Sequence, residues 1–203
     1  MCFFEPLTRM TLDRARLVAG NRVLDLACGT GIVARLATSF VGREGEVVAI
    51  DVRPGMIAKA RSIPPPSGAP VDFRVGDASG LDLPDGRFDV ILCQQGLQFF
   101  SDKVGAAREM RRVHVSGGRI VLAIWRGVEH QTLMADLVAA EARHLDKLGV
   151  PFEDVAAPFL LDSADEIHSI LRLAGFCDIE FSEASMPATF PSALSFVRDV
   201  ELA

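Results

Sequence analysis

Short apolar runs alternate with segments of helical spacing over residues 22–125. The runs are the length of strands and several are rich in Val, Leu and Ile, as in strands that are buried on both faces. Between them, apolar residues recur three and four positions apart, which is typical of helices. This alternation predicts an α/β, Rossmann-like, doubly wound sheet, mostly parallel, with helices on both faces. The predicted strands span residues 22–26, 47–50, 71–75, 88–93 and 119–125.

Helix boundaries can also be predicted from the sequence. Pro54 suits the first turn of one helix, and Asp102 can cap another that runs to Val113 and ends at Gly117-Gly118. In the second half of the chain the pattern is less regular. There we expect helices over 133–148, 163–174 and 192–201, and a sixth strand over 176–181.

Composition and charge exclude several classes of function. The chain has 27 acidic and 21 basic residues and no basic block, so a nucleic acid is not an expected partner. The four cysteines form no CxxC pair and no His cluster accompanies them, so we expect no metal site and free thiols in the cytoplasm. No apolar run has membrane-spanning length and the first residues are too charged for a signal peptide, so no membrane partner is expected.

A glycine turn follows the first predicted strand. Gly29 and Gly31 permit a sharp bend and close approach of the backbone to a ligand, and the helix after them offers free N–H groups to an anionic group. Together with Ala34 they also fit the G-x-G-x-x-A form of a dinucleotide fingerprint, and Asp51 lies 20 residues beyond Gly31, where a ribose-binding carboxylate belongs. Spacing alone therefore leaves a nicotinamide-dependent oxidoreductase open.

The segment VLDLACGTG (Val23–Gly31) resembles the first motif of the class I S-adenosylmethionine-dependent methyltransferase family, particularly its small-molecule, quinone-biosynthesis-like branch. Asp25 is characteristic of that motif. Residues 47–61, 76–100 and 108–125 resemble the motifs that follow it, in the same order. The resemblance implies an enzyme that uses S-adenosylmethionine and releases S-adenosylhomocysteine. It favours a methyltransferase over the oxidoreductase.

The resemblance also implies roles for residues that bind the adenosyl part of the cofactor. Asp51 is expected to accept from both ribose hydroxyls, because a carboxylate has two acceptor oxygens. Val52 and Met56 are expected to flank the adenine. Asp77 is expected to accept from the adenine amino group, while the Ala78 N–H meets a ring nitrogen.

A second set of residues is implied for the methionine part of the cofactor. Gly29 and Gly31 are expected to line it, with Asp25 and Ala27 holding the loop. Gln94 and Gln95, at the end of the fourth predicted strand, are expected to border the sulfonium and the substrate; their positions complete the implied cofactor site.

Methyl transfer from a sulfonium is an in-line displacement, so the protein chiefly aligns the acceptor and excludes water. If the acceptor is a phenol or an enol, His130 or a water held by Gln95 is the candidate proton acceptor, and the sequence names no other catalytic residue. The acceptor is expected to be a small molecule, which the sequence does not identify.

We expect a single domain over residues 1–203, with the cofactor-binding core at 22–125 and a substrate-side portion at 126–203. Members of the family finish with an antiparallel strand, yet only 20 residues follow Glu183, and Pro187 disfavours a strand at 186–190. We therefore expect this part to be shortened and the last strand to be missing. A non-catalytic cofactor-binding protein is the alternative, and a homodimer could cover the open sheet position.

Overall fold

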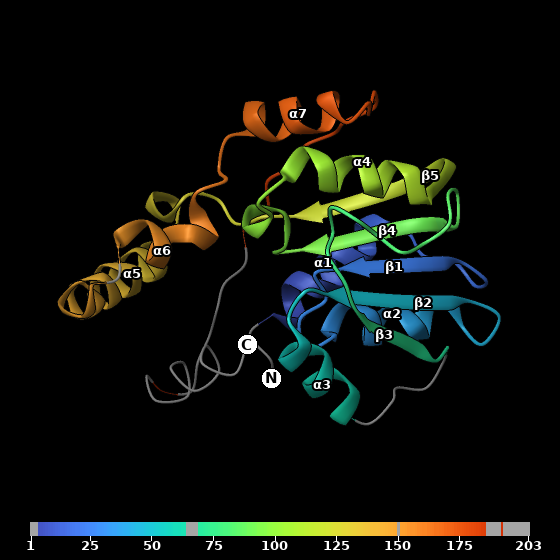
Figure 1. Cartoon of the computed structure of the whole chain (residues 1–203), viewed down its shortest axis with the longest axis horizontal. Coiled ribbons are helices and arrows are strands. Elements are labelled where there is room, and N and C mark those ends of the chain that lie inside the picture. The colour runs from blue at the N-terminus through green and yellow to red at the C-terminus, as the bar shows by residue number, and fades with distance from the viewer. Residues whose placement is uncertain (1–3, 64–68, 150, 186–191, 193–203) are drawn as a thin grey trace.

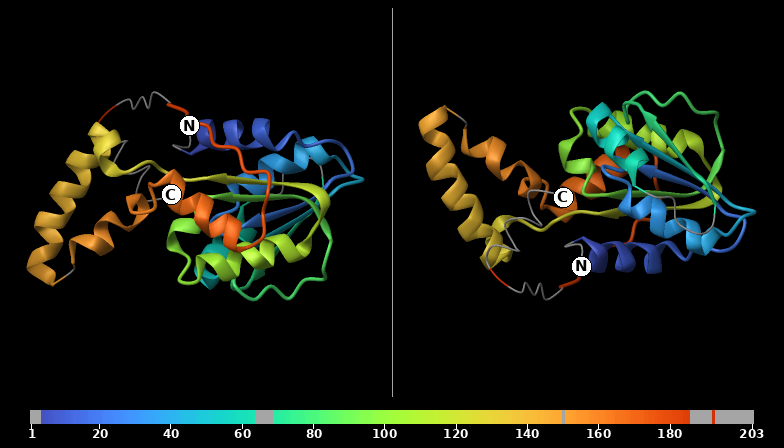
Figure 2. Two further views of the ribbon diagram at one scale, coloured as in Figure 1. Left: turned by 90° about the horizontal axis from the view of Figure 1, so that it is seen from above. Right: turned by 90° about the horizontal axis from the view of Figure 1, so that it is seen from below.

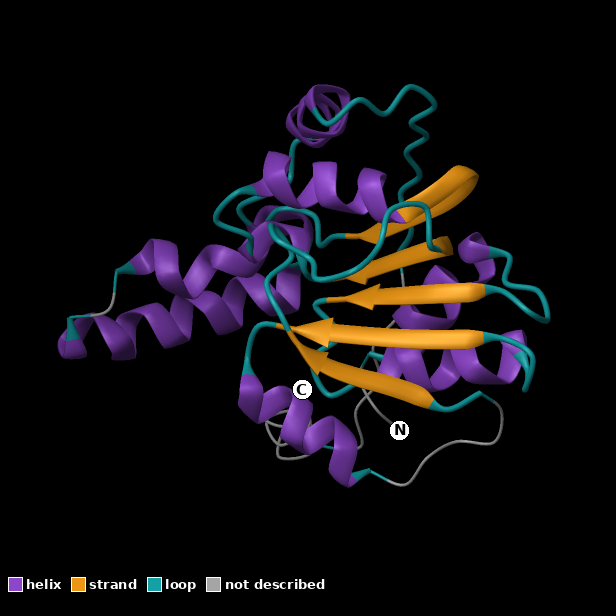
Figure 3. Ribbon diagram, turned by 45° about the vertical axis from the view of Figure 1, so that its right-hand side comes forward, coloured by secondary structure: helices purple, strands orange, loops and turns teal. Residues whose placement is uncertain are grey.

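The computed structural model describes residues 4–63, 69–149, 151–185 and Ser192. Its centre is a sheet of five parallel strands in the order β3-β2-β1-β4-β5, whose arrowheads all point to the same edge (Figure 3). The predicted α/β, doubly wound fold is confirmed. The strands are β1 (Arg22–Leu26), β2 (Glu46–Asp51), β3 (Val71–Val75), β4 (Phe88–Gln94) and β5 (His114–Ala123).

The strand order reverses between β1 and β4. From β1 the chain adds β2 and β3 outward on one side, then returns to place β4 and β5 on the other side. Val23 lies between Val47 of β2 and Val90 of β4 in the register of the sheet. In open parallel sheets, ligands bind beyond the carboxyl ends of the strands at such a reversal.

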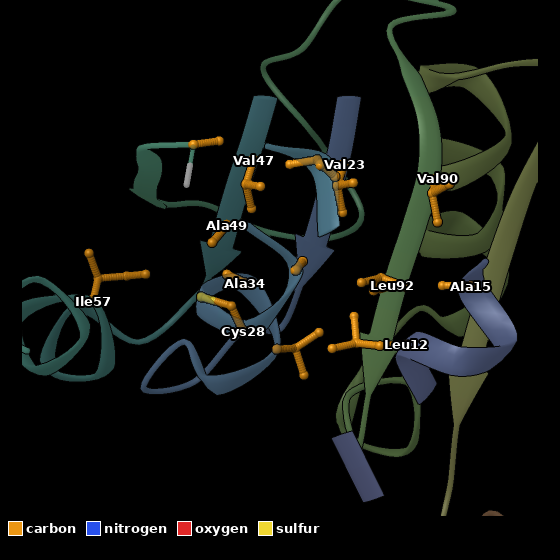
Figure 4. Close-up of a cluster of buried hydrophobic side chains, with 14 residues drawn as sticks. Leu12, Ala15, Val23, Cys28, Ala34, Val47, Ala49, Ile57, Val90 and Leu92 are labelled. Carbon is orange, nitrogen blue, oxygen red and sulfur yellow. The ribbon is translucent and has the colours of Figure 1, made fainter. Parts of the chain in front are cut away.

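Successive side chains of β1 enter opposite faces of the sheet, as the two-residue period of a strand requires. Val23 belongs to a buried cluster with α1 (Glu5–Ala15), α2 (Ile32–Val41) and α3 (Pro54–Ser62), shown in Figure 4. Leu24 belongs to a second cluster with α4 (Lys103–Val113). Figure 2 shows α1 and α2 on one face of the sheet and α4 on the other. Both faces are therefore covered by helices.

The helix α1 was not predicted from the sequence. Two of its buried positions hold Thr8 and Thr11, whose hydroxyls donate to carbonyl oxygens one turn earlier, at 2.9 and 3.0 Å. Because these hydroxyl side chains occupy two positions of the buried face, beside Leu12 and Ala15, the helical spacing of apolar residues is interrupted and the helix is hard to recognise in the sequence. The helix is held instead by burial and by tertiary contacts, among them a hydrogen bond from Arg119 to the Ala15 carbonyl at 2.8 Å.

The predicted boundary between α4 and β5 is wrong. Asp102 caps α4 as expected, accepting from the Gly105 N–H at 2.7 Å, and the helix runs to Val113 as predicted. The strand β5, however, begins at His114 instead of Arg119 and ends at Ala123 instead of Trp125. The register jumps from Phe88↔His114 to Val90↔Arg119, so the residues between are a bulge. Gly117 has a φ of +75° there, so it serves the bulge rather than the end of the helix.

An arm of helices projects from the sheet after β5, as Figures 1 and 2 show. It consists of α5 (Thr132–Leu145), the 3₁₀ helix η3 (Asp146–Leu148), α6 (Phe152–Ala156) and the 3₁₀ helix η4 (Ala157–Phe159). The helix predicted over 133–148 is thus confirmed, with a 3₁₀ last turn. Val138, Ala156 and Phe159 are buried where the arm joins the body, against Trp125.

The helix α7 (Ala164–Leu173) packs on α4. Ser163 caps it as predicted, its Oγ accepting from the Glu166 N–H at 3.3 Å. Gly175, just beyond the helix, has a φ of +92°, which suits the predicted end.

The sixth strand predicted over 176–181 is wrong, because these residues form no regular structure. Arg172 donates to the carbonyl oxygens of Phe176 and Cys177, at 3.2 and 3.5 Å, and Arg111 donates to that of Gly175 at 3.0 Å. These carbonyls bond to arginine side chains in place of a neighbouring strand. Among the described residues the sheet holds no antiparallel strand.

The predicted pieces at 186–190 and 192–201 lie outside the described residues, apart from Ser192. Within the described part of the chain, no helix has the length and apolar character needed to cross a membrane.

Candidate functional site

A large cavity lies where strands β1 to β4 end. Its volume is about 1000 Å³, at the upper end of the range for ligand pockets, which gives room for more than one small molecule. Gly29 follows β1, Asp51 ends β2, Asp77 follows β3 and Gln95 follows β4, and all four border it. The parallel sheet therefore brings residues that are far apart in sequence to one site.

The loop after β1 has an unusual backbone. Ala27, Gly29 and Gly31 have φ values of +58°, +55° and +80°, in the left-handed region that favours glycine. Ala27 and Gly29 border the cavity. A Cβ atom at Gly29 would meet nothing within 4 Å, so the glycine leaves its backbone open to a ligand.

Gly31 has a packing role instead. It is the N-cap residue of α2 and is not among the residues that border the cavity. A Cβ atom at Gly31 would lie 2.5 Å from Cε1 of Phe73 on β3, which no real contact allows. Its glycine is therefore required by its φ and by the Phe73 ring, not by an exposed backbone.

Asp51 joins two loops at the floor of the cavity. The residue is 8% exposed. Its Oδ2 accepts from the Gly29 N–H at 2.8 Å and its Oδ1 from the Arg53 N–H at 2.9 Å. A carboxylate has about four acceptor positions, so two remain for a ligand. Val52, 62% exposed, and Met56 border the cavity directly after Asp51.

Asp77 and Ala78 form the next part of the wall, after β3. Oδ1 of Asp77 accepts from the backbone N–H and the hydroxyl of Ser79, at 2.8 and 2.7 Å. These two hydrogen bonds lower the pKa of Asp77, so it stays an acceptor-only carboxylate near neutral pH. Ala78 is buried beside it.

Asp25 does not border the cavity. It is 1% exposed, and its Oδ2 accepts from the Ala34 N–H at 2.9 Å, tying β1 to the first turn of α2. Burial raises the pKa of Asp25 to about 7, with a smaller opposing effect from the Ala34 hydrogen bond. Its Oδ1 has no hydrogen-bond partner among the described residues.

Gln94 and Gln95 both border the cavity but differ in what they bind. The Nε2 of Gln94 donates to the Thr8 hydroxyl at 3.0 Å. Its Oε1 lies 3.2 Å from the Thr11 hydroxyl, whose hydrogen it shares with the Leu7 carbonyl, so Gln94 holds α1. Gln95 has a φ of +56°, and its Oε1 accepts from the Trp125 N–H at 3.3 Å.

His130 is not among the residues that border the cavity. Its Nε2 lies 2.9 Å from Nη2 of Arg126, 3.6 Å from Glu129 and 3.8 Å from Asp162. Glu129, His130 and Asp162 bring metal-ligand atoms together within 4.8 Å, but Arg126 donates to Asp162 at 2.9 Å. The guanidinium of Arg126 thus already supplies this cluster with a positive charge, which disfavours a metal ion there.

Sequence reasoning missed the apolar half of the cavity wall. It is built by the residue before α1, the segment after β5 and the arm, which no motif links. The spacing of Met134 and Val138 predicted a helix but no role in a site. Nothing in the sequence predicted that Gln98 would border the cavity, as it does. The missed apolar residues are Phe4, Trp125, Met134, Leu137, Val138, Val155 and Phe159.

Residues 23–118 match the model of a methyltransferase domain family. Over 116 residues the chain is 38% identical to the ubiquinone/menaquinone biosynthesis C-methyltransferase UbiE of Ectopseudomonas mendocina, covering 56% of this chain and 45% of that protein. Over 119 residues it is 36% identical to the aklanonic acid methyltransferase DauC of a Streptomyces species, covering 58% and 54%. The chain thus spans about half the length of these curated relatives.

Solved structures show the same fold. A chain from the complex between the Haloferax volcanii Trm112 methyltransferase activator and a methyltransferase superposes with a TM-score of 0.68 at 20% identity, covering 93% of this chain and 76% of that one. At this identity the likeness concerns the fold. The matched domain and the curated relatives confirm the resemblance of this chain to the class I S-adenosylmethionine-dependent methyltransferases, with quinone-biosynthesis enzymes among its relatives.

Proposed function

We propose that this chain binds S-adenosylmethionine in the cavity at the strand ends and transfers its methyl group to a small-molecule acceptor, leaving S-adenosylhomocysteine. The observation that carries the proposal is the position of Asp51, which ends β2, and Asp77, which follows the adjacent strand β3; both border one cavity. Val52 and Met56 lie between them along the chain, on the same wall. These residues match the adenosyl-binding pattern of the family.

The residues present fit the cofactor. Asp51 has acceptor capacity left for ribose hydroxyls, while its two existing hydrogen bonds keep it in place. Asp77 can accept from an exocyclic amino group, and the side chains of Val52 and Met56 offer apolar contact to a planar base. The open backbone at Gly29 is where the methionine portion would lie. When bound, S-adenosylmethionine supplies a methyl group on a positively charged sulfur that departs readily.

Besides binding the cofactor, the protein must align the acceptor with it and exclude water from the cavity. The apolar half of the cavity, with Phe4, Trp125 and Phe159, would hold the acceptor beside the cofactor site. Gln94 acts indirectly, by fastening α1, whose preceding residue Phe4 forms part of that wall. Asp25 and Gly31 shape the loop without touching either molecule. Alignment of the acceptor with the methyl group, in a cavity from which water is excluded, can supply most of the rate acceleration of a displacement reaction.

Calorimetric titration with S-adenosylhomocysteine tests the proposal. The wild-type chain should bind it, and Asp51→Ala should weaken binding about a hundredfold, the scale of two lost charge-assisted hydrogen bonds. Asp72→Ala is the matched control, because Asp72 is exposed on β3 and pairs with Arg74 away from the cavity. Absence of heat at millimolar ligand, or tighter binding of NAD, would overturn the methyltransferase proposal in favour of the oxidoreductase or another function. Binding without methyl transfer to any acceptor would support the non-catalytic alternative.

We also propose the cytoplasm as the compartment, since Cys28, Cys93 and Cys177 are free thiols. A homodimer that covers the outer edge of β5 stays a prediction, and size-exclusion chromatography with light scattering would test it.

A further inference from the structure

Gln98, in the 3₁₀ helix η1 (Leu97–Phe99), forms a pair with Gln95 at the cavity wall. The hydrogen bonds fix how both carboxamides are oriented. The Trp125 backbone N–H can only donate, so the Gln95 atom that it meets at 3.3 Å must be the oxygen. That oxygen also accepts from Gln98 at 2.8 Å, so the Gln98 atom there must be the nitrogen. Neither amide can be flipped without losing a hydrogen bond.

One donor and one acceptor are left over. Nε2 of Gln95 and Oε1 of Gln98 have no hydrogen-bond partner among the described residues, and both are shielded from solvent. Gln98 as a whole is 8% exposed. A buried polar group without a partner is costly, so such atoms mark sites that a ligand or a water completes. The positive φ of Gln95 is a further cost at this place, of the kind that functional sites retain.

The surroundings of the pair are apolar. The helix η1 packs against η4, which contributes Phe159 to the cavity, and the Gln95 side chain bonds to the backbone of Trp125. Asp51 and Asp77 lie after β2 and β3, on the cofactor side of the cavity, whereas the glutamine pair follows β4. The acceptor side thus offers extensive apolar contact and a buried neutral donor–acceptor pair, while the carboxylates that also border the cavity there, Asp102 and Glu141, are exposed to solvent.

We infer that the Gln95–Gln98 pair selects methyl acceptors that carry an uncharged hydroxyl group on an otherwise apolar body, and that Gln98 is the discriminating residue. This inference rests on the proposed function. A hydroxyl oxygen accepts from Nε2 of Gln95 while its hydrogen is donated to Oε1 of Gln98, so a single group satisfies both atoms. Because both atoms are buried in the structure, a hydroxyl reaches them only when the two carboxamides rotate about their broad terminal torsions, and the hydrogen bonds that it makes then replace the one lost between Gln98 and Gln95. A carboxylate or an ammonium satisfies only one of the two atoms and loses its solvation in an apolar wall.

The chain carries its own reporter for the test. Trp125 is the single tryptophan, the chain has no tyrosine, and Trp125 borders the cavity. Its fluorescence would be titrated, with the protein saturated with S-adenosylhomocysteine, using octan-1-ol, methyl octyl ether, octanoate and octylamine. Octan-1-ol should bind about tenfold more tightly than the ether, which cannot donate to Gln98, and more tightly than either ion.

Gln98→Met keeps the length of the side chain and removes both amide atoms, so the preference for octan-1-ol over the ether should disappear. Gln131→Met is the control, since Gln131 lies outside the cavity and donates to the Arg126 carbonyl; the preference should persist there. Equal binding of alcohol and ether by the wild-type chain, tighter binding of an ion, or an unchanged preference in Gln98→Met would overturn the inference. The wild-type comparison decides it even if the variant fails to fold. Calorimetry with S-adenosylhomocysteine is read separately, so loss of cofactor binding is distinguished from loss of selection.

Discussion

The backbone amide of Gly29 donates a hydrogen bond to Oδ2 of Asp51 at 2.8 Å, joining the loop after β1 to the end of β2. The same carboxylate accepts from Arg53, so it fixes the start of the segment that leads into α3 as well. Two motifs separated by about twenty residues therefore form one unit at the cavity floor. Substitutions in the glycine turn should therefore affect stability and cofactor binding separately, depending on the position.

Gly29→Ala and Gly31→Ala should have different consequences. Both place a side chain at positive φ, which costs about 1–2 kcal/mol. Gly31→Ala should lower the free energy of unfolding by more, because its Cβ would collide with Phe73. Gly29→Ala should chiefly weaken S-adenosylhomocysteine binding, because its methyl group enters the cavity. Urea denaturation and calorimetry measure the two effects; equal destabilisation by both variants would contradict this division.

The buried Asp25 should make stability depend on pH. Its pKa is raised to about 7 in the folded chain, so between about pH 4 and pH 7 the folded state keeps a proton that the unfolded state has released. The free energy of unfolding should therefore fall as the pH rises through this window, by on the order of 4 kcal/mol at most. Asp25→Asn cannot titrate and should flatten the change. Urea denaturation across the window tests this, with Asp72→Asn as an exposed control; an equally steep curve for Asp25→Asn would refute it.

Gln94→Leu should loosen α1. It removes the hydrogen bonds to Thr8 and Thr11, each contributing about 0.5–1.5 kcal/mol, and leaves two buried hydroxyls with one partner fewer. Amide hydrogen exchange in residues 5–15 should accelerate while S-adenosylhomocysteine affinity changes by less than it does in Asp51→Ala. Strong loss of affinity with unchanged exchange in α1 would instead give Gln94 the direct cofactor contact that its sequence position implies.

His130→Ala should leave methyl transfer and its pH profile unchanged. The imidazole lies beside Arg126 and Asp162, outside the residues that border the cavity, so it has no path to an acceptor proton there. The measurement is turnover across pH for the wild-type chain and the variant, with any acceptor that supports activity. Reduced turnover together with loss of the acidic limb of the profile in the variant would restore His130 as the proton acceptor.

Local patterns predicted the core of the fold well. Strands β1 and β3 have the predicted bounds, β2 is one residue longer at each end and β4 one residue longer at its end, because a buried strand needs an apolar run that the sequence displays directly. The error at 176–181 has a different origin. Those residues have the apolar pattern of a strand. In the structure, however, Arg111 and Arg172 donate hydrogen bonds to the backbone carbonyls of Gly175 and Phe176, and Ile179 packs against the α4–α7 cluster. Strand pairing depends on distant partners, which a local pattern does not contain.

By itself, the sequence determined the alternation of strands and helices, the residues that follow each strand and the family resemblance, because strand period, turn chemistry and motif order are all properties of neighbouring residues. Only the tertiary structure decided which of those residues reach the cavity. In the folded chain, Asp25 and Gly31 have packing roles and Gln94 and His130 bond to α1 and to Arg126. Gln98 and apolar residues from distant segments form the acceptor side of the cavity. The physical reason is that a side chain's neighbours across space set its burial and its hydrogen bonds, and chain position alone does not.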